Sequence, residues 1–304
     1  MQLGFVSAIL PDLSLTEVLQ FGSTAGFQAV ELMCWPVGRA ERRYAGVTHV
    51  DVNQLGPAKV RHIHDLCAEH SMGISGLGYY PNPLTTNLTQ RQHYVDHLRA
   101  VMDGAASLGV SVVNTFIGRD PARPIDAQWD DVLAVWTPLV EHAASCGLRI
   151  GIENCPMLFS LDEWPGGNNL AVSPAVWRRL FELFPGDTLG LNYDPSHMVI
   201  QHMDEVQPVR DFAARLWHVH AKDQRIDRAR LNDVGVWGLG WYVPKLPGLG
   251  QVRWSEFFAA LTDVGYNGAV CIEVEDRAYE GSLELRKLAL MQSKRYLDQF
   301  DAWQ

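Results

Sequence analysis

Short apolar runs alternate with longer amphipathic segments along the whole chain. Apolar runs of strand length between glycine, proline or polar residues are typical of buried strands. The amphipathic segments carry apolar residues at helical spacing, and several of them stop at a glycine. We expect strands at Leu3–Leu10, at Ala29–Met33, in the run that ends at Tyr79-Tyr80, at Val110–Phe116, and in the runs that begin at Arg149, Leu189, Leu216 and Ala269.

Helices are expected in the amphipathic segments between and after these strands. They cover Leu13–Ala25, Val60–His70, Gln90–Leu108, Asp131–Ser145, Pro174–Leu183, Val206–Arg215, Trp254–Val264 and Ser282–Phe300. Eight strand–helix units in succession predict an α/β fold, a single (β/α)₈ or TIM barrel. No linker or low-complexity stretch interrupts the pattern, so we expect one domain over residues 1–304.

The longest irregular stretch runs from Asp223 to Arg253 and is rich in glycine, tryptophan and proline. Long loops in compact domains are usually either functional or disordered. Trp237, Trp241 and Tyr242 favour order over disorder, because aromatic side chains pack. We therefore expect this stretch to form an ordered lid.

The last four expected strands each end in ionisable residues. Glu153, Asp194, His220 and Glu273 stand at or near these ends, and active sites of (β/α)₈ barrels lie where the strands end. A single carboxylate there is as often a helix cap, and a single histidine is more often a core or surface group. Four such residues on successive strands predict a metal site. Three carboxylates and an imidazole suit Mn²⁺, Mg²⁺ or Co²⁺ better than a thiolate zinc site.

Composition narrows the class of partner. The formal net charge of −10 over 304 residues argues against nucleic acid as the main partner and is compatible with a small sugar or polyol substrate.

The five cysteines are odd in number and form no CxxC motif, which favours reduced thiols in a cytosol over a disulfide framework. The N-terminus lacks the features of a signal peptide, and no run of about 18 apolar residues predicts a membrane span. We expect a cytoplasmic protein, with a homo-oligomer left open.

The motifs at these strand ends resemble those of a known superfamily. They are GIENCP (151–156), NYDPSH (192–197), HVHAKD (218–223), LPGLGQVRW (246–254) and GYNGAVCIEVED (265–276). Together they resemble the xylose isomerase-like TIM barrel superfamily, in particular its sugar phosphate isomerase/epimerase family, over the whole chain. That family is itself similar to ketose 3-epimerases, inosose dehydratases and endonuclease IV.

The resemblance implies a cofactor and several residue roles. It implies one divalent metal ion, usually Mn²⁺ with Mg²⁺, Co²⁺ or Zn²⁺ as alternatives, held by Glu153, Asp194, His220 and Glu273. It also implies that His197 binds substrate near the metal.

The sequence departs from the related enzymes in ways that argue against two known reactions of this superfamily. The first is the reaction of endonuclease IV. Endonuclease IV carries further histidines on strands three and four and after strand seven. Here those strand ends read Tyr79-Tyr80 and Asn114-Thr115, and no histidine follows His220. A trinuclear zinc site and cleavage at abasic sites are therefore not expected.

Two other positions bear on sugar chemistry. Xylose isomerases proper carry a lysine two residues after the strand-five glutamate, where this chain has Cys155, so their hydride-shift route is not expected. Ketose epimerases have an arginine shortly after the strand-seven histidine. Arg225 and Arg228 both lie in that region, and the spacing leaves both open.

These parts predict enolisation of a keto-sugar. A metal ion that binds a ketone and its neighbouring hydroxyl acidifies the adjacent C–H bond and stabilises the enediolate that forms. Glu153 and Glu273 are the expected catalytic residues, because one can take the proton and the other can return it. Return to the opposite face gives epimerisation, and return at the neighbouring carbon gives isomerisation. The candidate substrate-binding residues are His197, His218, Lys222, Arg225, Trp35 and Glu31.

Three hypotheses for the function follow. The first is a divalent-metal-dependent isomerase or epimerase that acts on a keto-sugar or related polyol through an enediolate. The second is a lyase of the same fold, either an inosose-type dehydratase or an enzyme that eliminates the aglycone of a 3-keto-glycoside. It is motivated by the aromatic stretch 223–253 as a wall for a bulky substrate, to which Trp35, Tyr79, Tyr80 and Phe116 could add. The third is a non-catalytic barrel.

Overall fold

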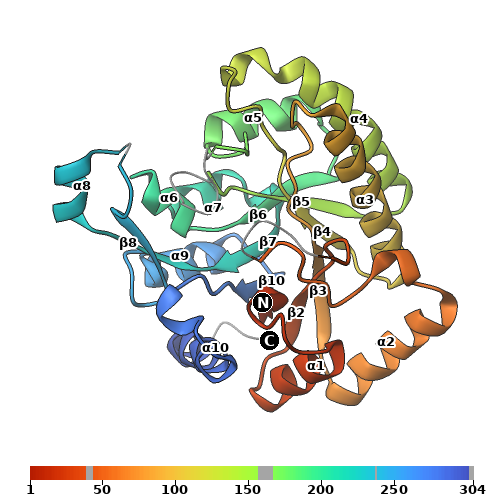
Figure 1. The fold of residues 1–304 in the computed structure, drawn as a ribbon. Coiled ribbons are helices and arrows are strands. Elements are labelled where there is room, and N and C mark those ends of the chain that lie inside the picture. The colour runs from red at the N-terminus through yellow and green to blue at the C-terminus, as the bar shows by residue number, and fades with distance from the viewer. Residues whose placement is uncertain (39–43, 157–166, 237, 301–304) are drawn as a thin grey trace.

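Eight parallel strands close into a barrel, which confirms the predicted fold class (Figure 1). The computed structural model describes residues 1–38, 44–156, 167–236 and 238–300. Around the barrel the strands follow the order β1-β10-β7-β6-β5-β4-β3-β2. Their bounds are β1 Gln2–Val6, β2 Ala29–Met33, β3 Gly73–Gly78, β4 Val112–Thr115, β5 Arg149–Glu153, β6 Leu189–Tyr193, β7 Leu216–Ala221 and β10 Ala269–Ile272.

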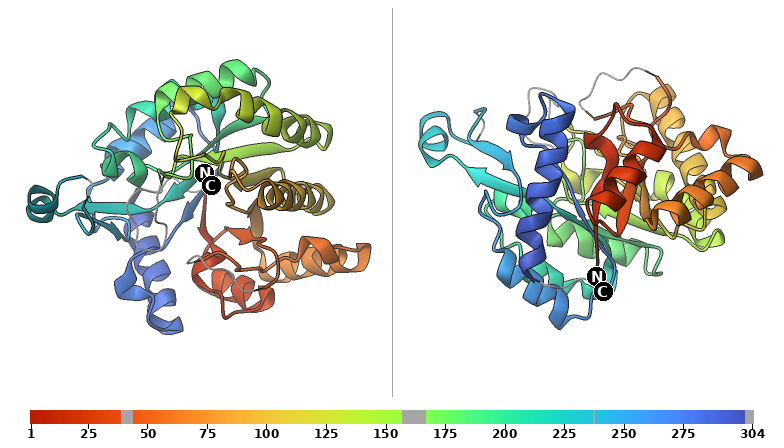
Figure 2. Two further views of the ribbon diagram at one scale, coloured as in Figure 1. Left: turned by 45° about the horizontal axis from the view of Figure 1, so that its top comes forward. Right: turned by 90° about the horizontal axis from the view of Figure 1, so that it is seen from below.

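Helices surround the strands, as Figure 2 shows. They are α1 Leu15–Thr24, α2 Pro57–His70, α3 Leu88–Ser107, α4 Trp129–Ser145, α5 Pro174–Leu183, α6 Ser196–Ile200, α7 Gln207–Asp211, α8 Arg228–Val234, α9 Trp254–Asp263 and α10 Leu283–Leu297. None of the described helices combines the length and the apolar character that crossing a bilayer requires.

Local sequence explains where several helices begin. Ser14 forms a capping box with Glu17 at the start of α1, and the side chain of Asn87 accepts a hydrogen bond from the Gln90 amide at the start of α3. Ser282 caps α10 in the same way. Such caps satisfy amide groups that have no partner within the helix.

Most expected elements match the observed ones within a few residues. The expected strand Leu3–Leu10 ends earlier, at Val6, because a 3-10 turn takes over at Ser7–Ile9. The expected helix Val206–Arg215 is shorter, since α7 stops at Asp211 and a 3-10 turn follows at Ala213–Arg215. The short helix α6, which carries His197, was not expected.

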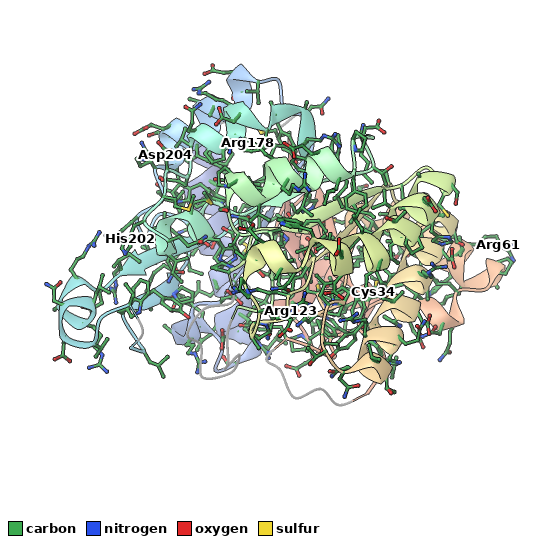
Figure 3. All side chains as sticks on the ribbon, turned by 90° about the horizontal axis from the view of Figure 1, so that it is seen from above. Cys34, Arg61, Arg123, Arg178, His202 and Asp204 are labelled. Carbon is green, nitrogen blue, oxygen red and sulfur yellow. The ribbon has the colours of Figure 1, made fainter. Side chains whose placement is uncertain are left out.

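The stretch 223–253 is ordered but forms an arm rather than a lid. Strands β8 (Asp223–Ile226) and β9 (Tyr242–Lys245) pair antiparallel, α8 lies between them, and the unit projects from the side of the barrel (Figure 1). Trp241 packs in a separate small cluster with Ile200 and Ile226. It also stacks on His202, with ring centroids 6.0 Å apart, and Figure 3 shows His202 near the arm.

This arrangement contradicts the expectation that the aromatic residues of 223–253 form a wall beside the substrate. Trp241 is 2% exposed because it packs between the arm and the segment of Ile200 and His202, and it does not line the cavity described below. Trp237, which was expected to act with it, lies outside the described residues. The prediction failed because an aromatic-rich stretch can build its own small core as readily as it can cover a substrate.

Asp223 fixes the base of the arm. Its carboxylate accepts hydrogen bonds from the backbone amides of Gly248, Gly250 and Val252 at 2.9–3.1 Å and from the indole of Trp254 at 2.9 Å. A Cβ at Gly250 would lie 2.2 Å from Asp223 Oδ1, so only glycine permits this approach. The LPGLGQVRW motif therefore serves to wrap a buried carboxylate, and Asp223 is a structural residue.

Candidate metal and active site

The four predicted metal ligands lie at one end of four adjacent strands. Glu153 is the last residue of β5, Asp194 follows β6, His220 lies in the second half of β7, and Glu273 follows β10. Because these strands are parallel neighbours, their carboxyl ends meet at the same mouth of the barrel. Glu153 is 3% exposed, and Asp194 and His220 are fully buried.

Distances between donor atoms link His220 to Glu153 and Glu273, and link these two to Asp194. His220 Nδ1 lies 3.7 Å from Glu153 Oε1 and 3.7 Å from Glu273 Oε2. Glu153, Asp194 and Glu273, together with His197, each offer a donor atom within 4.8 Å of the others. His197 Nε2 lies 3.1 Å from Glu153 Oε1 and 3.3 Å from Asp194 Oδ2. The structure therefore brings His197 to the same cluster.

Two asparagines that the sequence interpretation overlooked hold the backbone of Glu153 and Asp194 in place. The side chain of Asn154 donates to the Asp194 carbonyl at 3.0 Å and accepts from the Asp194 amide at 2.8 Å, which ties the end of β5 to the end of β6. Asn169 donates to the carbonyls of Glu153 and Cys155. The position of Asn154 directly after the predicted ligand was the only available signal.

Two buried polar atoms in this cluster, Asp194 Oδ2 and His220 Nδ1, accept or donate no geometrically formed hydrogen bond among the described residues. Asp194 Oδ2 nevertheless has charged neighbours, with the Lys222 ammonium 3.2 Å and His197 Nε2 3.3 Å away, so His220 Nδ1 is the atom without a close partner. Leaving a buried polar atom without a partner costs about 1–3 kcal/mol, so such atoms call for an explanation. A divalent cation bound by Glu153, Asp194, His220 and Glu273 would satisfy both atoms, and carboxylate oxygens with one imidazole suit a hard ion. The residues present fit the implied metal.

Glu31 lies behind His220 rather than in the cavity. Its Oε2 is 2.7 Å from His220 Nε2, and Tyr80 donates a hydrogen bond to its Oε1. Burial alone would raise the pKa of Glu31, but His220 holds it below its ordinary value. A Cβ at Gly78 would lie 2.5 Å from Glu31 Oε1, so this glycine makes room for the carboxylate. The contact leaves His220 Nδ1 as the ring nitrogen that faces the cluster.

His218 lies deeper in the barrel than the cluster. It is fully buried, with Nδ1 3.0 Å from Asn192 Oδ1 and Nε2 3.1 Å from Ser75 Oγ. Burial lowers the pKa of His218 to about 4, so the ring is neutral near pH 7. The structure thus gives its predicted substrate contact no support from geometry, and both ring nitrogens are already engaged by protein groups.

Lys222 extends into the carboxylate cluster. Its ammonium lies 2.5 Å from Glu273 Oε2, 2.9 Å from Glu275 Oε2 and 3.2 Å from Asp194 Oδ2. Burial opposes its charge, but Glu273 and Glu275 raise the pKa of Lys222 well above its ordinary value. The sequence interpretation included Lys222 but missed Glu275, although the Glu-Val-Glu pattern of 273–275 places two carboxylates on the same face of an extended chain.

A cavity opens over this cluster. Glu153, Lys222, Glu273 and Glu275 form its polar side. Its apolar side includes Trp35, Tyr80, Phe116 and Cys155. A concave site with a few convergent polar groups and an apolar wall is typical of a small-molecule site. Trp35 lines this cavity, and its contact with substrate stays a prediction.

The two predicted catalytic carboxylates differ in their electrostatics. Burial raises the pKa of Glu273 to about 7, with Glu153 and Glu275 adding to the rise and Lys222 opposing it. Burial also acts to raise the pKa of Glu153, but His197, His220 and Lys222 outweigh it and hold that pKa well below its ordinary value.

The structure does not bring the two candidate arginines to the cavity. Arg225 is exposed on β8, and Arg228 is exposed at the first position of α8. Neither lines the cavity. Both belong to the arm, and the sequence spacing could not reveal that the chain leaves the barrel after Lys222.

Comparisons with known proteins agree with this geometry. The chain is 26% identical to the uncharacterized protein YfiH of Bacillus subtilis (strain 168) over 91% of this chain and 93% of the relative. It is 31% identical to an inosose dehydratase of Geobacillus kaustophilus (strain HTA426), but only over 40% of this chain and 39% of the relative. The crystal structure of D-psicose 3-epimerase with D-tagatose, from Clostridium cellulolyticum H10, superposes with a TM-score of 0.72 at 13% identity, covering 98% of this chain and 99% of that one.

The family match covers most of the chain. Residues 19–299 match the family described as xylose isomerase-like TIM barrel. This span includes all four predicted metal ligands and seven of the eight barrel strands, since only β1 precedes it. The chain therefore belongs to the xylose isomerase-like TIM barrel family.

Proposed function

We propose that this protein is a divalent-metal-dependent isomerase or epimerase of a keto-sugar or related polyol. The observation that carries this proposal is the placement of Glu153, Asp194, His220 and Glu273 at the ends of adjacent strands, with His220 Nδ1 buried, 3.7 Å from both Glu153 and Glu273, and without a hydrogen-bond partner among the described residues. Mn²⁺ suits this donor set, as do Mg²⁺ and Co²⁺.

The comparisons support the reaction class but not the substrate. The chain has the fold of a D-psicose 3-epimerase, and at 13% identity that likeness is one of fold. The acidic, metal-competent cavity is what extends the likeness to chemistry. A cytoplasmic location and assembly into a homo-oligomer stay predictions from the sequence.

Each side chain around the cavity has a part in the proposed reaction. When bound, the divalent ion supplies the positive charge that stabilises a developing enediolate. One of the carboxylates Glu153 and Glu273 takes the proton from the carbon beside the carbonyl, and the other returns a proton to the opposite face or to the neighbouring carbon. Lys222 holds Glu273 through its 2.5 Å contact. The rings of Tyr80 and Phe116, 5.0 Å apart, help to exclude water.

Hydrogen exchange with solvent tests this proposal. Ketohexoses and ketopentoses are incubated in D₂O with protein that has been stripped with EDTA and reloaded with Mn²⁺. We expect deuterium at the carbon beside the carbonyl, detected by NMR. We also expect Glu153→Gln and Glu273→Gln to lower the exchange rate by about 100-fold or more, the range typical of general acid–base groups.

A matched control and two contrary outcomes complete the test. Glu182→Gln changes an exposed glutamate on α5 and is expected to leave exchange unchanged. Absence of deuterium with every substrate would reject enolisation. If cells that carry Glu153→Gln show the same phenotype as cells with the native protein, that result would instead support the non-catalytic hypothesis.

A lyase of the same fold is the second candidate. The observation that favours it is Lys222, whose ammonium lies between Glu273 and Glu275 at the cavity wall. A buried ammonium at that place can donate a hydrogen bond to a departing hydroxyl or glycosidic oxygen and stabilise its negative charge. The partial match to an inosose dehydratase agrees with this candidate. Loss of water from an inosose, or release of the aglycone from a 3-keto-glycoside, with an unsaturated product seen by mass spectrometry, would favour elimination over epimerisation.

A further inference from the structure

The Lys222 ammonium has more acceptors around it than it has N–H groups. Its Nζ lies 2.5 Å from Glu273 Oε2 and 2.9 Å from Glu275 Oε2. Asp194 Oδ2 and His197 Nε2 each lie 3.2 Å away. Because an ammonium carries three N–H donors, these four neighbours cannot all receive a full hydrogen bond. Lys222 can therefore give up one neighbour without leaving a donor unused.

Asp194 Oδ2 is the atom at which the ammonium and the proposed metal would meet. The other oxygen of this carboxylate, Oδ1, accepts a hydrogen bond from the Ser196 amide at 2.8 Å. A carboxylate oxygen offers two lone pairs, and Oδ2 already has Lys222 Nζ at 3.2 Å and His197 Nε2 at 3.3 Å beside it. Metal binding through Oδ2 therefore displaces one of these two neighbours.

Lys222 is the neighbour that can yield. Its ammonium ends a flexible four-carbon stem, whereas the ring of His197 turns about only two bonds. The backbone on both sides of Lys222 is fixed, because the Ala221 carbonyl accepts from the Glu273 amide at 3.2 Å and the Asp223 carboxylate is held by the amides that follow β9. Displacement from Asp194 therefore moves the lysine side chain alone.

Glu275 is a carboxylate that the ammonium can keep. It lines the cavity, and its side chain is 26% exposed. Among the described residues, it belongs to none of the groups whose donor atoms lie close enough to share a metal ion. Glu273, which does belong to such a group, can serve both cations, because a carboxylate has about four lone-pair sites. Glu275 is thus the partner of Lys222 that metal binding leaves untouched.

We propose that the Lys222 ammonium competes with the metal at Asp194 Oδ2, and that Glu275 is the positioning residue that keeps the displaced ammonium beside Glu273 at the cavity. Lys222 lines the cavity, so the ammonium can there donate a hydrogen bond to an oxygen of the substrate. This inference rests on the metal site of the proposed function, and its tests therefore measure metal binding rather than turnover.

Calorimetric titration of Mn²⁺ measures the competition, in protein stripped with EDTA and then dialysed. Lys222→Met removes the competing cation and is expected to raise Mn²⁺ affinity by about tenfold, within the range of coupling between contacting residues. Glu275→Gln removes the positioning carboxylate and is expected to lower Mn²⁺ affinity by about tenfold, because the ammonium then stays at Asp194. An unchanged affinity in both variants would overturn the competition.

The double variant separates positioning from simple charge. If Glu275 acts through Lys222, Glu275→Gln should change Mn²⁺ affinity by less than about threefold once Lys222→Met is present. Additive effects of the two substitutions would overturn the positioning role, because they would show that Glu275 acts on the metal by its charge alone. Glu275→Asp keeps the charge and should recover most of the affinity. Lys59→Met and Glu69→Gln change exposed residues of α2 and serve as controls.

Crystal structures of the native protein test the displacement without any substitution, so this test holds even if Lys222→Met folds poorly. Crystals treated with EDTA are compared with crystals soaked in Mn²⁺. With Mn²⁺ we expect Lys222 Nζ to lie more than about 3.5 Å from Asp194 Oδ2, outside hydrogen-bond distance, and to keep its contact with Glu275. An ammonium that stays hydrogen-bonded to Asp194 Oδ2 with Mn²⁺ bound would overturn the inference.

The outcomes separate this inference from the proposed function. Mn²⁺ affinity that neither Lys222→Met nor Glu275→Gln changes, together with normal deuterium exchange on a ketose, overturns the inference and leaves the proposed function intact. The expected changes in affinity without deuterium exchange on any ketose overturn the proposed function and support the inference. A native protein that binds no Mn²⁺ overturns both.

Discussion

The two cavities at the mouth of the barrel are built on opposite principles. The first is dense in charge, and the Lys222 ammonium alone contacts three carboxylates within 3.2 Å. The second, which Trp35, Gln90, His93 and Asn168 help to line, is larger, and its described lining residues include no acidic or basic side chain other than His93. Strand ends build the first, and the segments after β2 and β3 build most of the second. The difference teaches that the strand ends supply the charged groups at this mouth of the barrel, whereas loops shape the space beside them.

The largest effect should come from removing the internal cation of the first cavity. Lys222→Met leaves Glu273, Glu275 and Asp194 without their shared positive partner. We expect the free energy of unfolding to fall by about 3–5 kcal/mol, the range for a broken buried ion pair, measured by urea unfolding in EDTA. Added Mn²⁺ should recover part of the loss. Lys59→Met, at an exposed position of α2, is the control, and equal stability of the two variants would contradict the view of Lys222 as an essential counter-charge.

Removing a proposed ligand should have the next largest effect. Asp194→Asn takes away the negative charge of the Asp194 side chain, and we expect Mn²⁺ affinity to fall by more than about 100-fold, beyond the range seen for residues that only orient ligands. Calorimetric titration of Mn²⁺ measures this directly. Asp187→Asn, which changes an exposed residue just before β6, should bind like the native protein. Unchanged affinity in Asp194→Asn would place the metal elsewhere.

Replacing Glu31 should lower Mn²⁺ affinity by a smaller factor than replacing Asp194. Glu31→Gln keeps the size of the side chain but weakens its hydrogen bond with His220 Nε2, which lies 2.7 Å away. We expect Mn²⁺ affinity to fall by about 10- to 100-fold. A loss as large as that of Asp194→Asn would mean that Glu31 is itself a ligand, and no loss would mean that the barrel alone orients the ring.

The smallest effect concerns His97, a buried histidine behind the second cavity. His97 lies against Tyr79, and its Nε2 is 2.7 Å from the Cys34 carbonyl. Burial lowers the pKa of His97, so the unfolded chain binds the proton more tightly. Stability from this residue is therefore complete above about pH 6.5, the ordinary histidine value, and is lost as the pH falls below it.

Unfolding measured at two pH values checks that sign. In urea unfolding at pH 7.5 and pH 5, the native protein should lose more stability on acidification than His97→Gln. His62→Gln changes an exposed histidine on α2 and should behave like the native protein. An equal or larger loss in His97→Gln would show that protonation of His97 does not oppose folding.

The sequence was most informative where a strand is buried on both faces. The predicted strand Ala29–Met33 has the same bounds as β2, because five apolar or enclosed positions between turn signals leave few alternatives. The convergence of Glu153, Asp194, His220 and Glu273 was also predictable. Once eight parallel strands are assumed, their carboxyl ends must lie together.

The sequence was least informative where the direction of a side chain or loop depends on distant residues. Arg225 was predicted near the substrate, but β8 carries it outward on the arm. Glu31 was predicted to contact substrate, but it lies behind His220 because Gly78 on the neighbouring strand leaves space there. The second cavity arises from segments after β2, β3 and β5 that share no sequence pattern.

The carboxylate of Asp223 has a consequence for how this protein can diversify. It gathers Gly248, Gly250, Val252 and Trp254 at the junction where the arm leaves the barrel. These hydrogen bonds fix both ends of the arm to each other, whatever chain lies between them. We expect the exposed residues of α8 to accept insertions with little disturbance to the barrel, provided that Trp241 keeps its packing on Ile200 and His202, so the tip of the arm is a place where new surfaces can be added.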